Sequence, residues 1–241
     1  MIAVDIGNTS VHFAWFKNKR VVKTLKIPAV CLTAKEVRKV LSGCGTEKIL
    51  VCSVVPKITD IFDKLKLNIF VVGRDIKVPI RCSYNKKQVG VDRLIAAYTA
   101  KKLFSDTRLI FDFGTAITLD FLSKTGAYEG GIILPGIGST LRSLSQCALL
   151  PGEVKFKKTK ALIPKNTTDS INKGLEEGFS SMVNSLIKKY KQKLKVSLKN
   201  KVVITGGDVL PLMHKLDFAY RYEPLLVLRG LDFLATQHFS A

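Results

Sequence analysis

The feature that most constrains the fold of this chain is a short motif that occurs twice. An apolar run, an aspartate, one residue, a glycine and small polar residues lead directly into a second apolar run, first in MIAVDIGNTSVHFAW and again in RLIFDFGTAITLDFL. Aligning Asp5 with Asp112 also aligns the glycines at positions 7 and 114. Internal repetition of this kind predicts a duplicated architecture.

The first half of the chain predicts the order βββαβαβα. Thr33 and Glu36 form a capping box before a helical stripe, and Gly43 supplies a stop signal. Apolar and β-branched runs, broken by Gly, Asn and Pro, predict the other boundaries. In chain order we expect strands at 1–6, 10–16 and 20–27, a helix at about 33–42, a strand at 48–54, a helix at 57–67, a strand at 69–72 and a helix at about 91–104.

The same order starts again after a boundary near residue 105. We expect strands at 108–113, 116–122 and 128–134, helices near 138–148 and 169–194, a strand at 201–205, a helix at 208–215, a strand near 218–222 and a helix at 225–236. Two copies of βββαβαβα predict an α/β fold class, with two domains, 1–105 and 106–241, that face each other across a cleft.

Composition favours a globular, cytoplasmic protein. The 241 residues are 46% hydrophobic, enough for a sizeable core, and the five cysteines show no C-x-x-C spacing typical of a zinc site. The amino terminus carries Asp5 and no basic lead-in typical of a secretory signal. No apolar run approaches the roughly 20 residues of a membrane span, so we expect no membrane partner.

The formal net charge of +20 invites a nucleic-acid interpretation. The lysines, however, fall in short clusters such as KNKR, KFKKTK and KKYKQKLK, without the interleaved aromatic residues of a base-stacking surface. A solvated lysine-rich surface is the favoured interpretation, and nucleic acid is not an expected partner. A positive potential also attracts phosphorylated small molecules.

The two D-x-G turns have the chemistry of phosphate binding. Glycine allows close approach of backbone to a ligand, exposed N–H groups form an anion-binding concavity, and Asn8, Thr9 and Thr115 add donors. A carboxylate at the strand end suits a hydrated cation on phosphate oxygens. The alternative is a pair of plain hairpins, since Gly-Asn and Gly-Thr turns join strands in many proteins.

This pattern resembles the actin-like superfamily of sugar kinases, Hsp70-type ATPases and actin. Within it, five segments are similar in wording and order to the type III pantothenate kinase family: VGVDRLIAAYTA (89–100), IFDFGTAITLD (110–120), YEGGIILPGI (128–137), NTTDSINKG (166–174) and VVITGGD (202–208). The resemblance implies duplicated actin-like, or ribonuclease H-like, halves and an ATP-dependent kinase that converts pantothenate to 4′-phosphopantothenate, the first step of coenzyme A biosynthesis.

By the same resemblance, Asp92 is the general base that takes the proton from the primary alcohol of pantothenate. Gly90, Val91 and Arg93 line the substrate pocket, and Thr167 reaches it from a neighbouring subunit, which implies a homodimer with shared active sites. Read from the residues alone, Asp92 is a first-turn helix acid, Arg93 a surface ion-pair partner and Thr167 a helix cap. Tyr84 is a further substrate candidate, but it lies one residue out of the family register.

The resemblance also assigns the nucleotide and cation sites. It implies hydrated Mg²⁺ at Asp5, and a monovalent cation, K⁺ or NH₄⁺, at Asp112. His12 occupies a slot where relatives carry lysine, and its alternative is a strand-face residue without a ligand. The ATP-binding residues implied are Asp5, Gly7, Asn8, Thr9, His12, Gly114, Thr115, Gly206 and Gly207, although the last two also fit an ordinary strand-to-helix turn.

Two other functions stay open. One is a regulatory nucleotide-binding protein that acts as a transcription accessory factor, a role that the resemblance implies because some members of the family carry that name, and that fits the basic charge. The other is a different small-molecule kinase on the same scaffold. The segment Gly90-Val91-Asp92-Arg93 favours the pantothenate kinase, because a regulator needs no base beside the phosphates.

Overall fold

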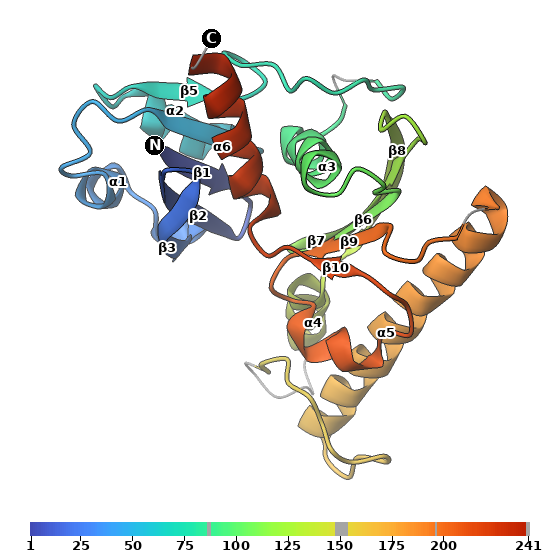
Figure 1. Cartoon of the computed structure of the whole chain (residues 1–241). Coiled ribbons are helices and arrows are strands. Elements are labelled where there is room, and N and C mark those ends of the chain that lie inside the picture. Colours follow the sequence, from blue (N-terminus) through green and yellow to red (C-terminus); the bar gives the residue numbers. More distant parts are fainter. Residues whose placement is uncertain (86–87, 148–153, 196, 240–241) are drawn as a thin grey trace. The chain divides into compact units, whose positions relative to one another are not determined.

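The computed structural model describes residues 1–85, 88–147, 154–195 and 197–239, and the chain divides into two compact units (Figure 1). The first unit comprises Met1–Ser105, Leu122–Gly130 and Leu225–Ala241, and the second comprises Asp106–Phe121 and Gly131–Pro224. A unit boundary therefore falls at residue 105, where the sequence predicts one. Two later segments, 122–130 and 225–241, nevertheless belong to the first unit.

The first sheet has five strands in the order β3-β2-β1-β4-β5. β1 pairs antiparallel with β2 and parallel with β4, and β4 pairs parallel with β5. This pairing agrees with the predicted order, because strands joined by a short turn pair antiparallel and strands separated by a helix can pair parallel. The strands are β1 (Ile2–Ile6), β2 (Ser10–Lys17), β3 (Arg20–Pro28), β4 (Ile49–Ser53) and β5 (Ile69–Val71).

The second sheet repeats this topology in the order β8-β7-β6-β9-β10. β6 pairs antiparallel with β7 and parallel with β9, and β9 pairs parallel with β10. β6 therefore corresponds to β1, so the predicted duplication is confirmed at the level of strand order and direction. The strands are β6 (Leu109–Phe113), β7 (Ala116–Leu122), β8 (Tyr128–Pro135), β9 (Val202–Thr205) and β10 (Arg221–Tyr222).

The helices follow the predicted positions with three differences. The segment predicted as a helix at 208–215 is a 3-10 helix, η2 (Leu210–Lys215), and the helix begun by Pro56 ends at Asp63. The helix predicted at 138–148 ends at Ser145, and position 148 lies outside the described residues. A further short 3-10 helix is η1 (Ala29–Cys31). The α-helices are α1 (Ala34–Val40), α2 (Pro56–Asp63), α3 (Val91–Leu103), α4 (Ile137–Ser145), α5 (Thr167–Leu194) and α6 (Leu226–Phe239).

Helix α6 explains why the chain's last segment joins the first unit. It packs on α3 and on strands β1 and β4 (Figure 1). The close approach depends on Gly230, because a Cβ there would lie 2.1 Å from Thr99 Oγ1 and 2.5 Å from Ile95. A single boundary at residue 105 therefore assigns α6 to the wrong unit. The spacing of apolar residues shows that a helix has a buried face, but not which sheet that face covers.

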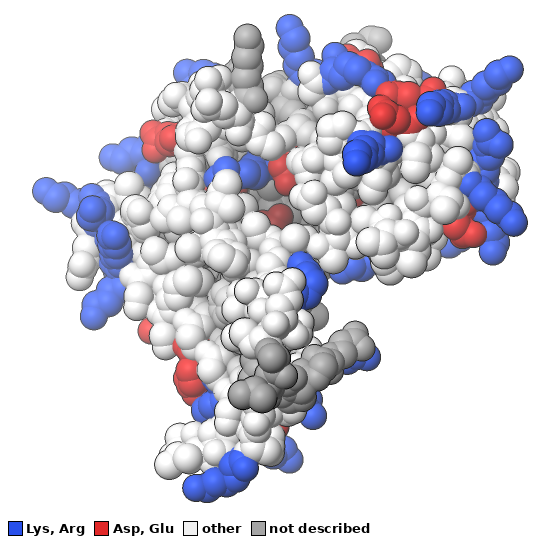
Figure 2. All heavy atoms as spheres, turned by 180° about the vertical axis from the view of Figure 1, so that it is seen from behind, with Lys and Arg blue, Asp and Glu red and all other residues white. Residues whose placement is uncertain are grey.

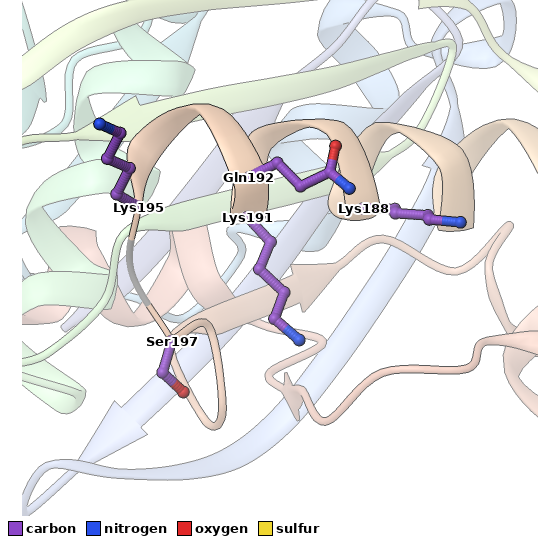
Figure 3. Close-up of a pocket in the computed structure, with 5 residues that line it drawn as sticks. All are labelled: Lys188, Lys191, Gln192, Lys195 and Ser197. Carbon is purple, nitrogen blue, oxygen red and sulfur yellow. The ribbon is translucent and has the colours of Figure 1, made fainter.

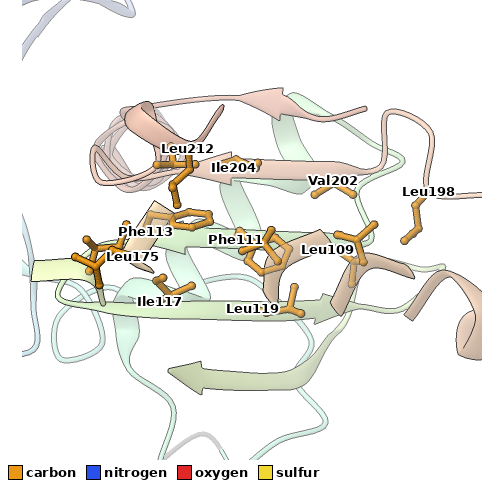
Figure 4. Close-up of a cluster of buried hydrophobic side chains, with 14 residues drawn as sticks. Leu109, Phe111, Phe113, Ile117, Leu119, Leu175, Leu198, Val202, Ile204 and Leu212 are labelled. Atoms are coloured by element: carbon orange, nitrogen blue, oxygen red, sulfur yellow. The ribbon is translucent and has the colours of Figure 1, made fainter. Parts of the chain in front are cut away.

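Each unit has its own apolar core. In the second unit, alternate residues of β6 and β7 point to one face of the sheet, where Leu175 of α5 and Leu212 of η2 meet them (Figure 4). The core of the first unit gathers apolar side chains of β1, β2 and β4 with Val37 of α1 and Phe62 of α2. Across the part of the chain that the structure describes, no helix is long and apolar enough to cross a membrane.

Candidate active site

The first D-x-G motif connects β1 to β2, as predicted. Gly7 N–H donates to Ser10 O at 3.0 Å and closes the turn, while Asn8 and Thr9 are exposed at its tip. The carbonyl of Thr9 accepts from Ala29 N–H at 2.9 Å, which ties the turn to η1. The tip is thus held by backbone bonds and leaves polar groups toward solvent.

Asp5 lies just before this turn and is in register with one side chain on each neighbouring strand. Its cross-strand partners are His12 on β2 and Cys52 on β4. Burial, and then the negative charge of Asp92, raise the pKa of Asp5 from its usual 3.8 to about 7, although the Cys52 thiol donates a hydrogen bond that lowers it. A half-buried carboxylate beside a second one is a place where a cation would be stabilised.

Cys52 was not among the predicted site residues. The strand pattern KILVCSV contains the signal, because β4 lies next to β1 and Cys52 is in register with Asp5. Fully buried, it acts as a small side chain with a weak donor.

His12 is held between two polar neighbours. Its Nε2 lies 2.9 Å from Ser10 Oγ, and Lys26 is its cross-strand partner on β3. Burial, and then the charge of Lys26, lower the pKa of His12 to about 4. The imidazole is therefore neutral at physiological pH and offers a hydrogen bond rather than a positive charge.

Asp92 lies in the first turn of α3, where Gly90 is the N-cap. Its Oδ1 accepts a hydrogen bond from Arg93 N–H at 2.8 Å, which fixes the orientation of the carboxylate. A Cβ at Gly90 would lie 2.4 Å from this same Oδ1. Glycine at position 90 therefore leaves the space that the Asp92 carboxylate occupies.

Arg93 and Tyr84 converge on one ring. The guanidinium carbon of Arg93 lies 5.8 Å from the centroid of Tyr128, and the Tyr84 ring meets Tyr128 edge-on at 6.5 Å. Tyr128 is fully buried, whereas Tyr84 is 42% exposed. A Cβ at Gly130 would approach the Tyr84 ring to 3.3 Å. Tyr128 is thus an anchor that the predicted site did not include, although its segment YEGG carries the resemblance.

The second D-x-G motif connects β6 to β7. Gly114 N–H donates to Ala116 O at 3.1 Å, and Asp112 is in register with Thr118 on β7 and Thr205 on β9. The carbonyl of Thr115 accepts from Gly136 N–H at 3.1 Å and from Ser139 Oγ at 2.7 Å. The start of α4 therefore holds this hairpin in place.

Neither hairpin glycine is demanded by the chain's own packing. A Cβ at Gly7 would make an ordinary contact of 3.4 Å, and at Gly114 the nearest atom would be 3.8 Å away. Without a side chain at these two positions, the space outside each turn stays open. A ligand can therefore approach the backbone closely there.

Gly206 has a structural reason of its own. Its φ is +89°, and a Cβ would lie 2.2 Å from the carbonyl oxygen of Phe113 at the end of β6. Tyr222 Oη donates to Gly206 O at 3.2 Å. Gly207, in contrast, has no atom within 4 Å of a Cβ position. Gly206 thus locks the turn after β9, and Gly207 leaves an open surface.

Replacing Gly206 with alanine is expected to lower the free energy of unfolding by at least about 2 kcal/mol, because the methyl group meets backbone and the positive φ is strained. Gly207→Ala is the matched control and should change stability by less than about 0.5 kcal/mol. Urea unfolding of both variants measures the difference. Equal stabilities would contradict the packing described at Gly206.

Thr167 is the first residue of α5 and is exposed. The helix cap is Asn166, whose side chain accepts from Asp169 N–H at 2.9 Å, so Thr167 is not the cap that the residues alone suggested. None of the hydrogen bonds or ring contacts of the described residues joins Thr167 to the other candidate residues.

A pocket of about 550 Å³ lies at the carboxyl end of α5, and none of the candidate residues lines it (Figure 3). Lys188, Lys191, Gln192, Lys195 and Ser197 line it. Basic side chains also project in several separate groups from the face in Figure 2, with fewer acidic ones. The pocket contains no predicted catalytic group. In the first unit the candidate residues lie at the first hairpin and the start of α3, and in the second unit at the second hairpin.

Comparisons with known proteins identify the family of this chain. Residues 1–189 match the family model described as type III pantothenate kinase. A protein of Sulfurihydrogenibium sp. named type III pantothenate kinase is 32% identical over 251 residues, an alignment that covers 97% of this chain and 98% of the relative.

Two solved structures share the fold. A Campylobacter jejuni protein assigned to the Baf family of transcriptional activators has a TM-score of 0.63 and 22% identity, and all of both chains is covered. The activator of 2-hydroxyisocaproyl-CoA dehydratase from Clostridium difficile, with bound ADPNP, has a TM-score of 0.55 and 12% identity over 100% of this chain and 97% of that one. With the duplicated sheets, these neighbours confirm the predicted actin-like fold.

Proposed function

Because this chain belongs to the type III pantothenate kinase family, and so phosphorylates pantothenate with ATP in coenzyme A biosynthesis, we propose that Asp92 is the general base of that reaction. The observation that carries this proposal is the position of the Asp92 carboxylate, which a hydrogen bond from Arg93 N–H orients and which lies close enough to Asp5 to raise its pKa. The first hairpin, next to Asp5, has open space outside its glycine. In phosphoryl transfer, such a group accepts the proton of the attacking hydroxyl.

The start of α3 also supplies the proposed pantothenate contacts. Arg93, held over the Tyr128 ring, is suited to the substrate carboxylate, because a guanidinium pairs with a carboxylate through two parallel hydrogen bonds. Tyr84 adds an exposed ring edge beside the same Tyr128. Gly90 and Val91 complete the contact by presenting backbone at the beginning of the helix.

ATP is the phosphoryl donor, and we assign its phosphates to the two hairpins. In the first, the proposed contacts are backbone and side-chain donors of Gly7, Asn8 and Thr9, with neutral His12 as a further donor. In the second, Gly114 and Thr115 play the same part. The open surface at Gly207, fixed in place by Gly206, is proposed to meet the adenosine.

Kinases of this kind use ATP together with Mg²⁺, which neutralises charge that develops on the transferring phosphoryl group. The residues fit the ion: Asp5 and Asp92 bring two carboxylates near each other in a half-buried place. We assign hydrated Mg²⁺ to Asp5. A monovalent cation, K⁺ or NH₄⁺, is assigned to Asp112, whose cross-strand neighbours Thr118 and Thr205 add hydroxyl oxygens.

Purified protein is expected to form phosphopantothenate only when ATP, Mg²⁺ and pantothenate are all present, and faster with K⁺ than with Na⁺ alone. A coupled assay of ADP release measures this. A pantothenate analogue that lacks the primary hydroxyl is the control, and should inhibit competitively without being consumed. ATP turnover unaffected by pantothenate would contradict the assignment.

A homodimer in which Thr167 completes the partner's site is also proposed. Two adjacent aliphatic side chains just before α5, Leu162 and Ile163, are 84% and 69% exposed, and a second copy would cover them. The double substitution to aspartate is expected to give monomers in analytical ultracentrifugation and to lower activity at least about tenfold. Val30→Asp, at a position 93% exposed, is the control and should stay dimeric. Monomeric wild-type enzyme with full activity would rule this assembly out.

A further inference from the structure

A buried carboxylate outside the proposed site has few partners. Glu176, in α5, is 1% exposed, and neither of its carboxylate oxygens accepts a hydrogen bond from the described residues. Its nearest polar neighbours are His214 Nε2 at 3.1 Å and Lys173 Nζ at 4.0 Å. Burying a carboxylate is costly, so an acid at this position needs a reason, and the short contact with His214 is the strongest candidate.

His214 belongs to η2, which begins three residues after Gly207. A 3-10 helix has poorer hydrogen-bond geometry than an α-helix, so its position depends more on packing and on side-chain contacts. Leu212 of η2 and Val209 just before it are fully buried in the second unit's core, and η2 packs on α5. The Glu176–His214 contact is therefore made at the junction of α5 and η2.

Other contacts hold the end of η2 and the residues after it. Asn184 of α5 donates to Lys215 O at 2.8 Å and accepts from Asp217 N–H at 3.2 Å. Lys215 Nζ also reaches Glu177 Oε1 at 2.7 Å. At the other end, Gly206 is fixed against Phe113. The segment from 207 to 214 is thus anchored at both ends, and Glu176 is the buried charged group that contacts it, at His214.

We propose that Glu176, acting through His214, is a positioning residue that sets the place of the Gly206–Gly207 turn and so tunes affinity for the nucleotide. The inference rests on the proposed assignment of this turn to adenosine. Glu176 touches no reacting atom in this scheme. It holds η2, whose first residue, Leu210, donates a backbone hydrogen bond to Gly207 O at 3.3 Å.

The test compares Glu176→Gln with Glu177→Gln, which remove the same charge from adjacent positions of α5. Glu177 is half-exposed, and its ion pair with Lys215 is worth little. The Asn184 bonds still hold the end of η2 without it, so the Glu177 variant should keep constants within about twofold of wild type. Glu176→Gln is expected to raise KM for ATP about fivefold or more and to leave KM for pantothenate within about twofold. Equal rises of both constants, or no rise in either, would overturn the proposal.

Calorimetric titration with MgATP alone measures nucleotide affinity without the reaction. It therefore tests the positioning role of Glu176 separately from the kinase assignment. If wild-type protein binds MgATP but phosphorylates no pantothenate, the kinase assignment fails and the positioning role is still measured by the weaker binding of Glu176→Gln. If that variant does not fold, His214→Gln on the half-exposed partner replaces it, with the same weakening expected. Wild-type MgATP affinity in a folded Glu176→Gln or His214→Gln protein would refute the role.

Discussion

Replacing Asp92 with asparagine is expected to lower kcat by about 10²- to 10⁴-fold, the usual contribution of a general base. Asparagine keeps the shape of the side chain, and its oxygen can still accept from Arg93 N–H at the start of α3. It cannot take a proton from the substrate hydroxyl. KM for pantothenate should therefore change by only about threefold, since binding does not need the base. Steady-state kinetics with both substrates measures these constants.

The matched control for Asp92 is Glu36→Gln. Glu36 is also a first-turn acid, in α1, and is partly exposed. If Asp92 only favoured the positive end of its helix, the two substitutions would act alike and cost a few tenths of a kcal/mol of stability. Loss of kcat in the Asp92 variant alone separates catalysis from helix stabilisation. A kcat within about threefold of wild type would contradict the general-base role.

Local pattern was enough to predict most of the fold. The apolar runs of period two, the capping box at Thr33 and the two D-x-G turns gave element types in the right order, because each signal acts within a few residues. The sequence does not predict that α6 packs in the first unit, because the pattern of an apolar helix contains no information about which sheet it covers. The segment around Leu210 is 3-10 rather than α, a distinction that apolar spacing does not make.

The sequence predicts candidate site residues where a motif is contiguous, as in Gly90-Val91-Asp92-Arg93, and their roles stay predictions. The structure adds reasons that a sequence cannot show: the carboxylate of Asp92 occupies space left by Gly90, and Gly206 meets Phe113, a residue far away in the chain. Cys52 and Tyr128 were missed because their roles come from register and packing with distant residues. The cytoplasmic location and the dimer stay predictions.

Asp5→Asn is expected to make the ligand-free protein more stable and nearly inactive. The pKa of Asp5 is about 7 in the folded protein and 3.8 in the unfolded chain. The folded state thus holds its proton to higher pH, and stability falls as pH rises from about 4 to 7. The difference between these two pKa values corresponds to roughly 4 kcal/mol, an upper limit for a carboxyl group that is only half-buried.

At pH 8, where the wild-type carboxylate is charged, asparagine removes this cost, so a gain of about 1 to 3 kcal/mol and several degrees in Tm is expected. At pH 4 the gain should disappear, because Asp5 is then protonated in the folded state. Thermal unfolding without nucleotide or Mg²⁺ at both pH values measures the difference. Asp60→Asn, at an exposed position of α2, is the control and should leave Tm within about 1 °C at either pH.

The activity of Asp5→Asn tests whether the ionised Asp5 carboxylate, which lowers the stability of the ligand-free protein, is needed for catalysis. If Asp5 holds hydrated Mg²⁺ on the phosphates, Asp5→Asn should lower kcat/KM for MgATP by about 100-fold or more while Tm rises. A carboxylate that strains the empty protein and is neutralised by the bound cation explains both effects through one charge. A stabilised variant with wild-type kinetics would instead place Mg²⁺ elsewhere, and a variant without gain at pH 8 would mean that water reaches Asp5 freely.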